Sequence, residues 1–294
     1  MNINQQKVVA YYTRRGTRLL FDYVLWGSKH FGFYPTGKAD IPEEQAQILL
    51  QDLVAKNLAL QRGQRVLDAG CGQGIVSTYL AKKYGPNIFG ITLVPFEVEK
   101  AGKLANELGV SNTTHYQVMD YSSTSFPNNY FDAIYTTETL SHSTDIRKTL
   151  QEFFRILKPG GTIALFEYTT AAGEKFTEWE RRMFNLVVEG SAMMGLKDFE
   201  HGQFTKVIRS AGFESVNEQN ISENILPSFY RIHKLSVWPY KLVKLFGLQK
   251  FFINITAGYE YYKMAEKGLF RYCVFTGSKP KESAAEEQRW GNDV

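Results

Sequence analysis

The chain has 294 residues, of which 44% are hydrophobic and 22% are charged, and it carries a formal net charge of +4. This composition predicts a globular protein that can bury a sizeable core. The small net charge, without a long run of basic residues, argues against a dedicated nucleic-acid-binding protein.

The first 60 residues have a helical pattern. We predict two short helices within residues 3–25, a loop rich in glycine and aromatic residues over 26–37, and a further helix over 42–59. Residues 1–60 are therefore expected to form an N-terminal helical segment ahead of the main domain.

The middle of the chain alternates between strand-like and helix-like segments. Because the two types alternate, we expect a mostly parallel sheet with helices on both faces. The short apolar runs that predict strands are residues 65–69, 87–91, 114–120, 131–137 and 161–169. The amphipathic stretches that predict the intervening helices are residues 75–85, 94–109 and 144–157.

The last third of the chain continues this pattern and then departs from it. Helices are predicted at 174–190 and 200–211, followed by a strand at 213–219. The sequence after that is aromatic and amphipathic, and it ends in a polar tail that we predict to be disordered. The resulting segments are a core over 61–222, an insertion over 223–266, a last strand within 267–278 and the tail over 279–294.

The chain has two cysteines, Cys71 and Cys273, which are too few for a disulfide framework or a zinc cluster. The N-terminus lacks an apolar stretch of signal-peptide length, and no segment reaches the roughly 18 consecutive apolar residues typical of a membrane span. We therefore expect a cytoplasmic protein with reduced cysteines.

A glycine-rich turn follows the first predicted strand of the core, in VLDAGCGQG (66–74). Asp68 ends the apolar run, and Gly70, Gly72 and Gly74 then alternate. Glycines at this spacing let the backbone turn sharply and approach a ligand closely, while the next helix begins facing that ligand. Such a turn alone is consistent with a dinucleotide site or with a plain connection between strand and helix.

Together with three later segments, this turn resembles class I S-adenosylmethionine-dependent methyltransferases. The later segments are MDYSSTSFP (119–127), YFDAIYTTETLSH (130–142) and FRILKPGGTIALFEY (154–168). The resemblance implies a Rossmann-like α/β fold, with a seven-stranded, mostly parallel sheet and a helical lid inserted before the last strand. It also implies S-adenosyl-L-methionine as the cofactor.

The resemblance assigns the first group of cofactor-binding residues. In that superfamily the acidic residue at the position of Asp120 meets the adenine. We therefore expect Asp68, Gly70, Gly72, Asp120 and Tyr121 to bind the cofactor. The chain shows no cluster of His and Asp with the spacing of metal ligands, so no metal is expected.

The residues at the end of the second predicted strand distinguish a nicotinamide dehydrogenase from a particular subgroup of methyltransferases. A nicotinamide dehydrogenase would carry an acidic residue there to bind ribose hydroxyls, but this chain has Thr92. Thr92 and Leu93 resemble a subgroup comprising sterol C-methyltransferases, tocopherol methyltransferases and cyclopropane-fatty-acid synthases. Where that subgroup has a Gln in the next helix, this chain has Glu97, whose carboxylate can accept from both ribose hydroxyls. Glu97 is also consistent with an acid favoured at a helix N-terminus.

The segment YYTRRGTRLLFDYVLWGSKHFGFYP (11–35) is similar to the entry segment of sterol and tocopherol methyltransferases, although its spacer is a few residues longer. The resemblance implies that Tyr12 reaches the methionine carboxylate of the cofactor. The same aromatic residues are also consistent with packing of a helix onto the sheet edge, which is the favoured interpretation for Phe31 and Phe33. The matching residues are Tyr11, Tyr12, Trp26, Gly27, His30, Gly32, Phe33 and Tyr34.

The segment YTTETLSHSTD (135–145) resembles the loop after the fourth strand of sterol methyltransferases, which carries a Glu and, four positions on, a His. Glu138 and His142 match this pattern, at the end of a parallel strand where α/β folds place reacting groups. We expect Glu138 or His142 to remove a proton and Tyr34 to stabilise positive charge through its ring. Solvated or capping roles are the alternative.

The insertion over 223–266 is expected to be a lid, because its many aromatic residues suit an apolar acceptor. We expect C-methylation of an isoprenoid or sterol-like hydrophobic small molecule. The alternatives are an O-, N- or ring C-methyltransferase of an aromatic natural product, and a catalytically silent cofactor-binding cyclase. Lysines in the insertion are also consistent with peripheral membrane contact. The sequence is also compatible with a homo-oligomer, and no nucleic acid is expected as a partner.

Overall fold

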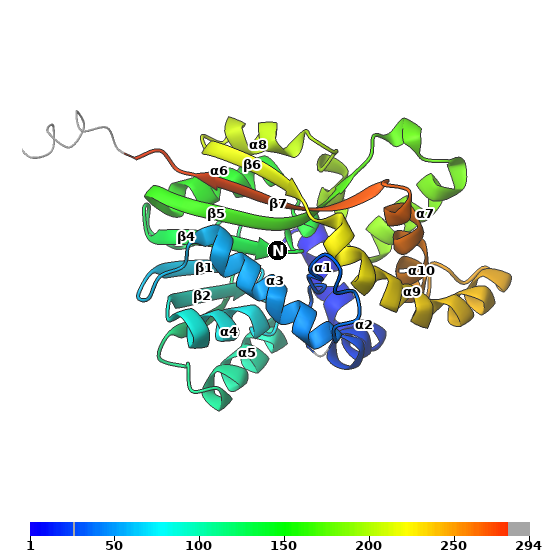
Figure 1. Cartoon of the computed structure of the whole chain (residues 1–294), viewed down its shortest axis with the longest axis horizontal. Coiled ribbons are helices and arrows are strands. Elements are labelled where there is room, and N and C mark those ends of the chain that lie inside the picture. Colours follow the sequence, from blue (N-terminus) through cyan, green and yellow to red (C-terminus); the bar gives the residue numbers. More distant parts are fainter. Residues whose placement is uncertain (26, 282–294) are drawn as a thin grey trace, which may run out of the picture.

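The computed structural model describes residues 1–25 and 27–281. Within them the chain forms one seven-stranded sheet in the order β3-β2-β1-β4-β5-β7-β6 (Figure 1). The strands from β1 to β5 are mutually parallel, and β7 runs antiparallel to both β5 and β6. The strands are β1 (Arg65–Ala69), β2 (Asn87–Thr92), β3 (Thr114–Val118), β4 (Phe131–Thr137), β5 (Leu157–Thr170), β6 (Glu214–Asn220) and β7 (Phe270–Ser278).

Helices cover both faces of this sheet, as the alternating pattern predicts. In Figure 1, α3, α4 and α5 lie on one face, and α6 and α8 lie on the other. The remaining helices gather beyond the right-hand end of the sheet in that view. The main helices are α1 (Ile3–Thr13), α2 (Arg15–Leu19), α3 (Glu43–Leu58), α4 (Ile75–Tyr84), α5 (Pro95–Glu107), α6 (Ile146–Ile156), α7 (Glu178–Gly190), α8 (Phe204–Ser210), α9 (Ser222–Leu245) and α10 (Ile253–Glu266). Shorter helical turns are η1 (Leu20–Val24), η2 (Leu140–His142), η3 (Gly173–Lys175) and η4 (Met194–Asp198).

Local sequence explains where these helices begin and end. The side chain of Asp145 caps α6 by accepting from the Lys148 N–H, and Leu150 and Phe153 then face the core. Gly85 ends α4 with φ 78°, a conformation that favours glycine. The predicted helix over 174–190 begins later, at Glu178, because Thr177 and Glu180 form a capping box at that point.

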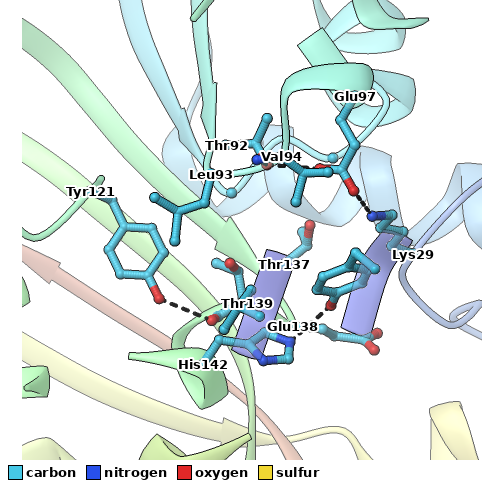
Figure 2. Close-up of a pocket in the computed structure, with 14 residues that line it drawn as sticks. Lys29, Thr92, Leu93, Val94, Glu97, Tyr121, Thr137, Glu138, Thr139 and His142 are labelled. Carbon is cyan, nitrogen blue, oxygen red and sulfur yellow. Dashed lines mark hydrogen bonds and ion pairs between the residues drawn. The ribbon is translucent and has the colours of Figure 1, made fainter. Parts of the chain in front are cut away.

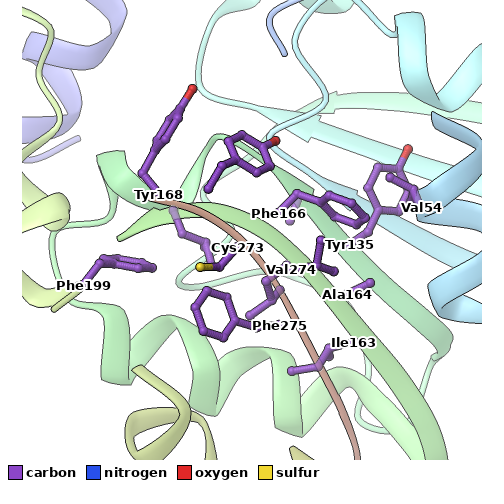
Figure 3. Packing of buried hydrophobic residues seen from close by; sticks show 14 of the residues in the cluster. Val54, Tyr135, Ile163, Ala164, Phe166, Tyr168, Phe199, Cys273, Val274 and Phe275 are labelled. Carbon is purple, nitrogen blue, oxygen red and sulfur yellow. The ribbon is translucent and has the colours of Figure 1, made fainter. Parts of the chain in front are cut away.

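The core sits on both faces of β5, which explains the unbroken apolar run over residues 163–166 within this strand. Figure 3 shows Phe166 of β5 and Phe275 of β7 among the buried residues of this layer. The strand begins at Leu157 and not at residue 161 as predicted. Leu157 pairs with Phe131, and regular pairing resumes at Thr162 after a bulge.

The predicted insertion over 223–266 forms α9 and α10, which pack against each other, and α10 also packs against α7. In the part of the chain that the structure describes, no helix is both long enough and apolar enough to cross a membrane. Trp26 and most of the tail predicted to be disordered, residues 282–294, lie outside the described residues.

Candidate functional site

The glycine turn connects β1 to α4 and packs directly against the loop that follows β4. Gly70, Gly72 and Gly74 all have positive φ, at 94°, 51° and 80°. A Cβ at Gly70 would overlap the side chain of Thr139, whereas one at Gly72 would meet the flexible chain of Lys29 at 3.2 Å. Of the three glycines in this turn, Gly70 therefore has the closest contact, and a side chain there would require Thr139 to move.

A cavity opens between this turn, α1, the end of β2 and the loop after β4; we call it the glycine-loop cavity (Figure 2). It brings together nine of the residues expected from sequence, although they come from five separate segments. These residues are Tyr12, Gly70, Gly72, Thr92, Leu93, Glu97, Tyr121, Glu138 and His142. Val8, Lys29, Val94, Thr137 and Thr139 also line the cavity and were not predicted.

Glu97 is buried at one end of this cavity. Its Oε2 accepts a 2.7 Å hydrogen bond from Thr92 Oγ1, and its Oε1 pairs with Lys29 Nζ. Lys29 also lies 3.8 Å from the ring centroid of Tyr12, and burial lowers its pKa. Figure 2 shows the chain of Lys29 reaching across to Glu97. A lone lysine in an irregular loop carries no sequence signal that would have identified this partner.

Asp120 and Asp68 do not line the cavity. Asp120 accepts from the Ser122 N–H at 2.8 Å, and its other oxygen accepts from Gln5 of α1, which fixes α1 beside Tyr121. Asp68 is buried in β1, and this burial raises its pKa to about 7. Asp120 therefore lies next to the cavity, while Asp68 lies within the sheet that supports the glycine turn.

Glu138 follows β4 with φ +58°, a conformation that is uncommon for a non-glycine residue and is typically found at functional sites. Its Oε1 accepts from the Phe31 N–H at 2.8 Å and from the Tyr272 hydroxyl at 3.1 Å. Its Oε2 accepts from the Tyr168 hydroxyl. Burial raises the pKa of Glu138 to about 8, although these three donors act in the opposite direction.

His142 is held as a neutral imidazole. Its Nδ1 lies 2.9 Å from the carbonyl oxygen of Ala192, which can only accept, so Nδ1 carries the proton. Its Nε2 then accepts from the Tyr12 hydroxyl at 2.8 Å. Burial lowers the pKa of His142 to about 4. The lone pair that a base would need is therefore already occupied.

Glu167 of β5 fixes the loop that carries Glu138 and His142. Its Oε1 accepts from the Thr136 hydroxyl at 2.9 Å and from the N–H groups of Thr139 and Leu140 at 3.1 and 3.0 Å. Glu167 is fully buried, and burial raises its pKa to about 7. It therefore acts as a structural anchor behind the site.

A second cavity, which we call the apolar cavity, adjoins the first. Tyr12, Lys29, Glu138 and His142 line both cavities, so these residues form the wall between them. Segments from three parts of the chain enclose the apolar cavity: the N-terminal segment, the core and the α9–α10 insertion. The lining includes Phe31 from the first, Tyr168 from the second, and Phe229, Ile232, Ala257 and Tyr261 from the third.

The structure places Tyr34 elsewhere, so its expected catalytic position needs correction. Tyr34 lines neither cavity, and its hydroxyl donates to Glu43 at 3.0 Å. Glu43 also accepts from Ser228 and Arg231 of α9. His30 is likewise buried and lines neither cavity. Phe31, for which packing was the favoured interpretation, lines the apolar cavity and donates to Glu138.

Replacing Gly70 by Ala should disturb the site more than the same change at Gly63. Both glycines have positive φ, so both variants share the backbone cost, but a Cβ at Gly63 meets no atom within 4 Å. At Gly70 it must displace Thr139, which we expect to cost a further 1–3 kcal/mol or so in unfolding free energy. Denaturant unfolding measures this difference. Titration calorimetry with S-adenosylmethionine should show lost affinity for Gly70→Ala alone; equal behaviour of the two variants would contradict the assignment.

The stability of the cofactor-free protein should fall as pH rises from about 6.5 to about 8. The pKa values of Asp68, Glu138 and Glu167 in the folded protein are raised to about 7, 8 and 7. In the unfolded chain, carboxyl groups have pKa values of about 4. The folded state thus binds more protons than the unfolded state in this window, so the free energy of unfolding decreases with pH. Below about pH 6.5 the buried neutral histidines His30 and His142, both with pKa about 4, oppose this trend.

Thermal unfolding across this pH range measures the effect. The Glu138→Gln variant lacks one of the three carboxyl groups and should show a weaker dependence. An identical dependence in both proteins would mean that Glu138 is ionised throughout.

Comparisons with known proteins agree with this geometry. The model of a methyltransferase domain matches residues 67–165. An S-adenosyl-L-methionine-dependent Diels-Alderase, iccD of Talaromyces variabilis, is 30% identical over 94% of this chain and 96% of its own length. The sterol 24-C-methyltransferase erg6 of Aspergillus fumigatus is 27% identical over 75% of this chain and 59% of its own length.

Among solved structures, the [4+2]-cyclase SpnF is 25% identical, with a TM-score of 0.77 over 95% of this chain and 98% of its own. The similarity to iccD spans nearly the whole of both chains, and the matched domain contains the glycine turn and the loop after β4. The chain therefore belongs to the class I S-adenosylmethionine-dependent methyltransferase family, in the subgroup that includes the sterol C-methyltransferases, and its cofactor is S-adenosyl-L-methionine.

Proposed function

We propose that this protein transfers a methyl group to a carbon atom of an extended, apolar acceptor of the isoprenoid or sterol type. The observation that carries the proposal is the position of Glu138. Its carboxylate lies on the wall between the glycine-loop cavity and the apolar cavity. A group there would act on an acceptor at the point where it meets the cofactor.

The residues of the glycine-loop cavity fit S-adenosylmethionine. Gly70 leaves no room for a side chain, and the buried carboxylate of Glu97, which can accept more bonds than those from Thr92 and Lys29, would accept from ribose hydroxyls. Asp120, beside Tyr121, would receive the adenine amine, and Tyr12 would lie toward the methionine end. When bound, the cofactor supplies an electrophilic methyl group on a positively charged sulfur.

The lining of the apolar cavity supports an uncharged acceptor. Aromatic and aliphatic side chains form most of its wall, including Phe31, Phe229 and Ile232. Among the described residues that line it, Lys29 is the one cation, and this side chain pairs with Glu97. A prenyl diphosphate would need several cationic groups or a metal for its phosphates. The wall thus favours a hydrocarbon-rich acceptor without a diphosphate.

Glu138 would both stabilise positive charge and take up a proton. Methylation of a carbon–carbon double bond leaves a carbocation on the acceptor. A C–H bond next to the cation then breaks, its electron pair re-forms a double bond, and the proton passes to a carboxylate oxygen. Among the described residues, two donors bind Oε1 and Tyr168 alone binds Oε2, so Oε2 retains a lone pair that could take up the proton. The rings of Phe31 and Phe229 would stabilise the cation further.

Ring closure of a polyene in the same cavity is the second candidate. The similarity over full length to iccD and SpnF, whose names give a Diels-Alderase and a [4+2]-cyclase, favours it. In that reaction a protonated Glu138, whose pKa burial raises to about 8, would donate a hydrogen bond to a carbonyl group of the substrate.

An assay with methyl-labelled cofactor separates the two candidates. Sterols, prenylated phenols, prenyl diphosphates and linear polyenes would be offered as substrates. Methyl transfer gives a labelled product and an equal amount of S-adenosylhomocysteine, and we expect this with an uncharged isoprenoid or sterol. An unlabelled isomer of the substrate, formed equally well with S-adenosylhomocysteine in place of the cofactor, would instead establish cyclisation.

The Glu138→Gln variant replaces the carboxylate by an amide of nearly the same shape. It should keep its cofactor affinity but turn over about a hundredfold more slowly, the usual scale of general base catalysis. His142→Ala should cost less, because the Nε2 of His142 is already occupied by Tyr12. Single-turnover rates and cofactor titration measure these effects. A dead His142→Ala variant beside a fully active Glu138→Gln variant would reverse the two roles.

Filling the apolar cavity should remove activity without affecting the cofactor. Ala257 of α10 lines this cavity but not the glycine-loop cavity, so Ala257→Trp would occupy acceptor space alone. We expect unchanged cofactor affinity and at least a tenfold or so loss of turnover, by analogy with overpacked apolar sites. Ala265→Trp, on the same helix outside both cavities, is the control. Normal turnover by Ala257→Trp would place the acceptor elsewhere.

A further inference from the structure

Large apolar side chains are exposed at the tip of the α9–α10 insertion. Five of them stand between 61% and 78% exposed, although they lie within a short stretch at the end of α9 and in the connection to α10. Single exposed apolar residues are common, but a cluster of this kind marks an interaction site. The cluster, which we call the tip surface, consists of Trp238, Leu242, Leu245, Phe246 and Phe251.

The tip surface lies within a strongly basic segment. Residues 224–259 contain no Asp or Glu but carry Arg231 and four lysines. Lys241 Nζ lies 4.1 Å from the ring centroid of Trp238, and Lys244 Nζ lies 4.7 Å from that of Trp179. Apolar side chains flanked by lysines are the pattern of a helix that rests on an anionic bilayer, with its apolar groups among the acyl chains and its cations at the phosphates.

The same two helices connect this surface to the apolar cavity. Phe229 and Ile232 of α9 line the cavity, as do Ala257 and Tyr261 of α10. Figure 1 shows the far end of the α9–α10 pair projecting from the body of the molecule, beyond α7. One end of the insertion thus lines the apolar cavity, and its other end, which carries the tip surface, projects into solvent, where an extended surface such as a bilayer can contact it.

We propose that the tip surface docks the protein onto an anionic membrane, so that a lipid-soluble acceptor enters the apolar cavity from the bilayer. The docking rests on the tip surface alone, whereas the entry of the acceptor rests on the function proposed above. Charge complementarity favours a membrane over a second copy of this chain. Two tip surfaces facing each other across a twofold axis would bring Lys241 and Lys244 of both copies together.

Sedimentation of the full-length chain with vesicles tests the docking. Vesicles of phosphatidylcholine alone are compared with vesicles that also contain phosphatidylserine. We expect binding to the anionic vesicles, weakened by high salt. The double variants Leu245→Asp/Phe246→Asp and Lys241→Glu/Lys244→Glu should each reduce the partition coefficient about tenfold or more.

Two controls separate the tip from general surface effects. Ile48→Asp places a charge on an exposed apolar residue of α3, and Lys82→Glu/Lys103→Glu makes the same change in net charge on α4 and α5. Both controls should bind like the unmodified chain. Equal losses in controls and tip variants, or no binding to either vesicle, would overturn the proposal. A dimer in sedimentation equilibrium that Leu245→Asp/Phe246→Asp dissociates would assign the surface to a second copy.

The docking and the proposed reaction can fail independently. With an acceptor delivered in detergent, the tip variants should retain full methyl transfer, because none of the substituted residues lines either cavity. Vesicle binding without any methyl transfer would leave the docking intact and remove the proposed reaction. Loss of transfer in detergent would mean that the tip variants disturb the insertion itself, and the docking would then be contradicted.

Discussion

The site depends on the hydrogen bonds that Glu167 accepts from the loop after β4. An isolated carboxylate in the core would be costly, but the N–H groups of Thr139 and Leu140 and the hydroxyl of Thr136 offset part of that cost. These bonds set the backbone of the loop. Thr139 then closes on Gly70, and Glu138 takes its left-handed conformation between the two cavities. One buried acid thus positions two residues of the candidate site, Glu138 and Thr139.

The second acid, Glu138, makes the centre electrostatically unusual. Burial and the charge of Glu167 both raise its pKa, so a proton competes for it at neutral pH. A positive charge in the adjoining cavity would favour the carboxylate form, as would a carbocation on the acceptor. The tyrosines that donate to it come from β5 and β7, which pair antiparallel at Tyr168 and Tyr272. Sheet register therefore fixes the polar groups that tune this acid.

Most of the fold was predictable from the sequence, and so were nine residues of the glycine-loop cavity. The alternation of strands and helices can be read along the chain. The glycine turn and the spacing of Glu138 and His142 each lie within one short segment, so each can be recognised without knowing what the segment contacts. Lys29 and the backbone of Phe31 could not be predicted in this way, because the sequence records no contact between a loop and a distant strand. Tyr34 matched a motif, but Glu43 of α3 provides a buried partner that holds its hydroxyl away from the site.

The cost of keeping Glu138 in place favours a reaction that uses its charge. Its backbone is strained, its carboxylate is buried, and three donors are arranged around it. A polar hydroxyl would serve ring closure nearly as well, since that reaction needs a hydrogen-bond donor and no net proton transfer. Carbon methylation instead creates a cation and releases a proton at one place. In the proposed reaction Glu138 would meet both needs with a single side chain, so carbon methylation accounts for this geometry better than cyclisation alone.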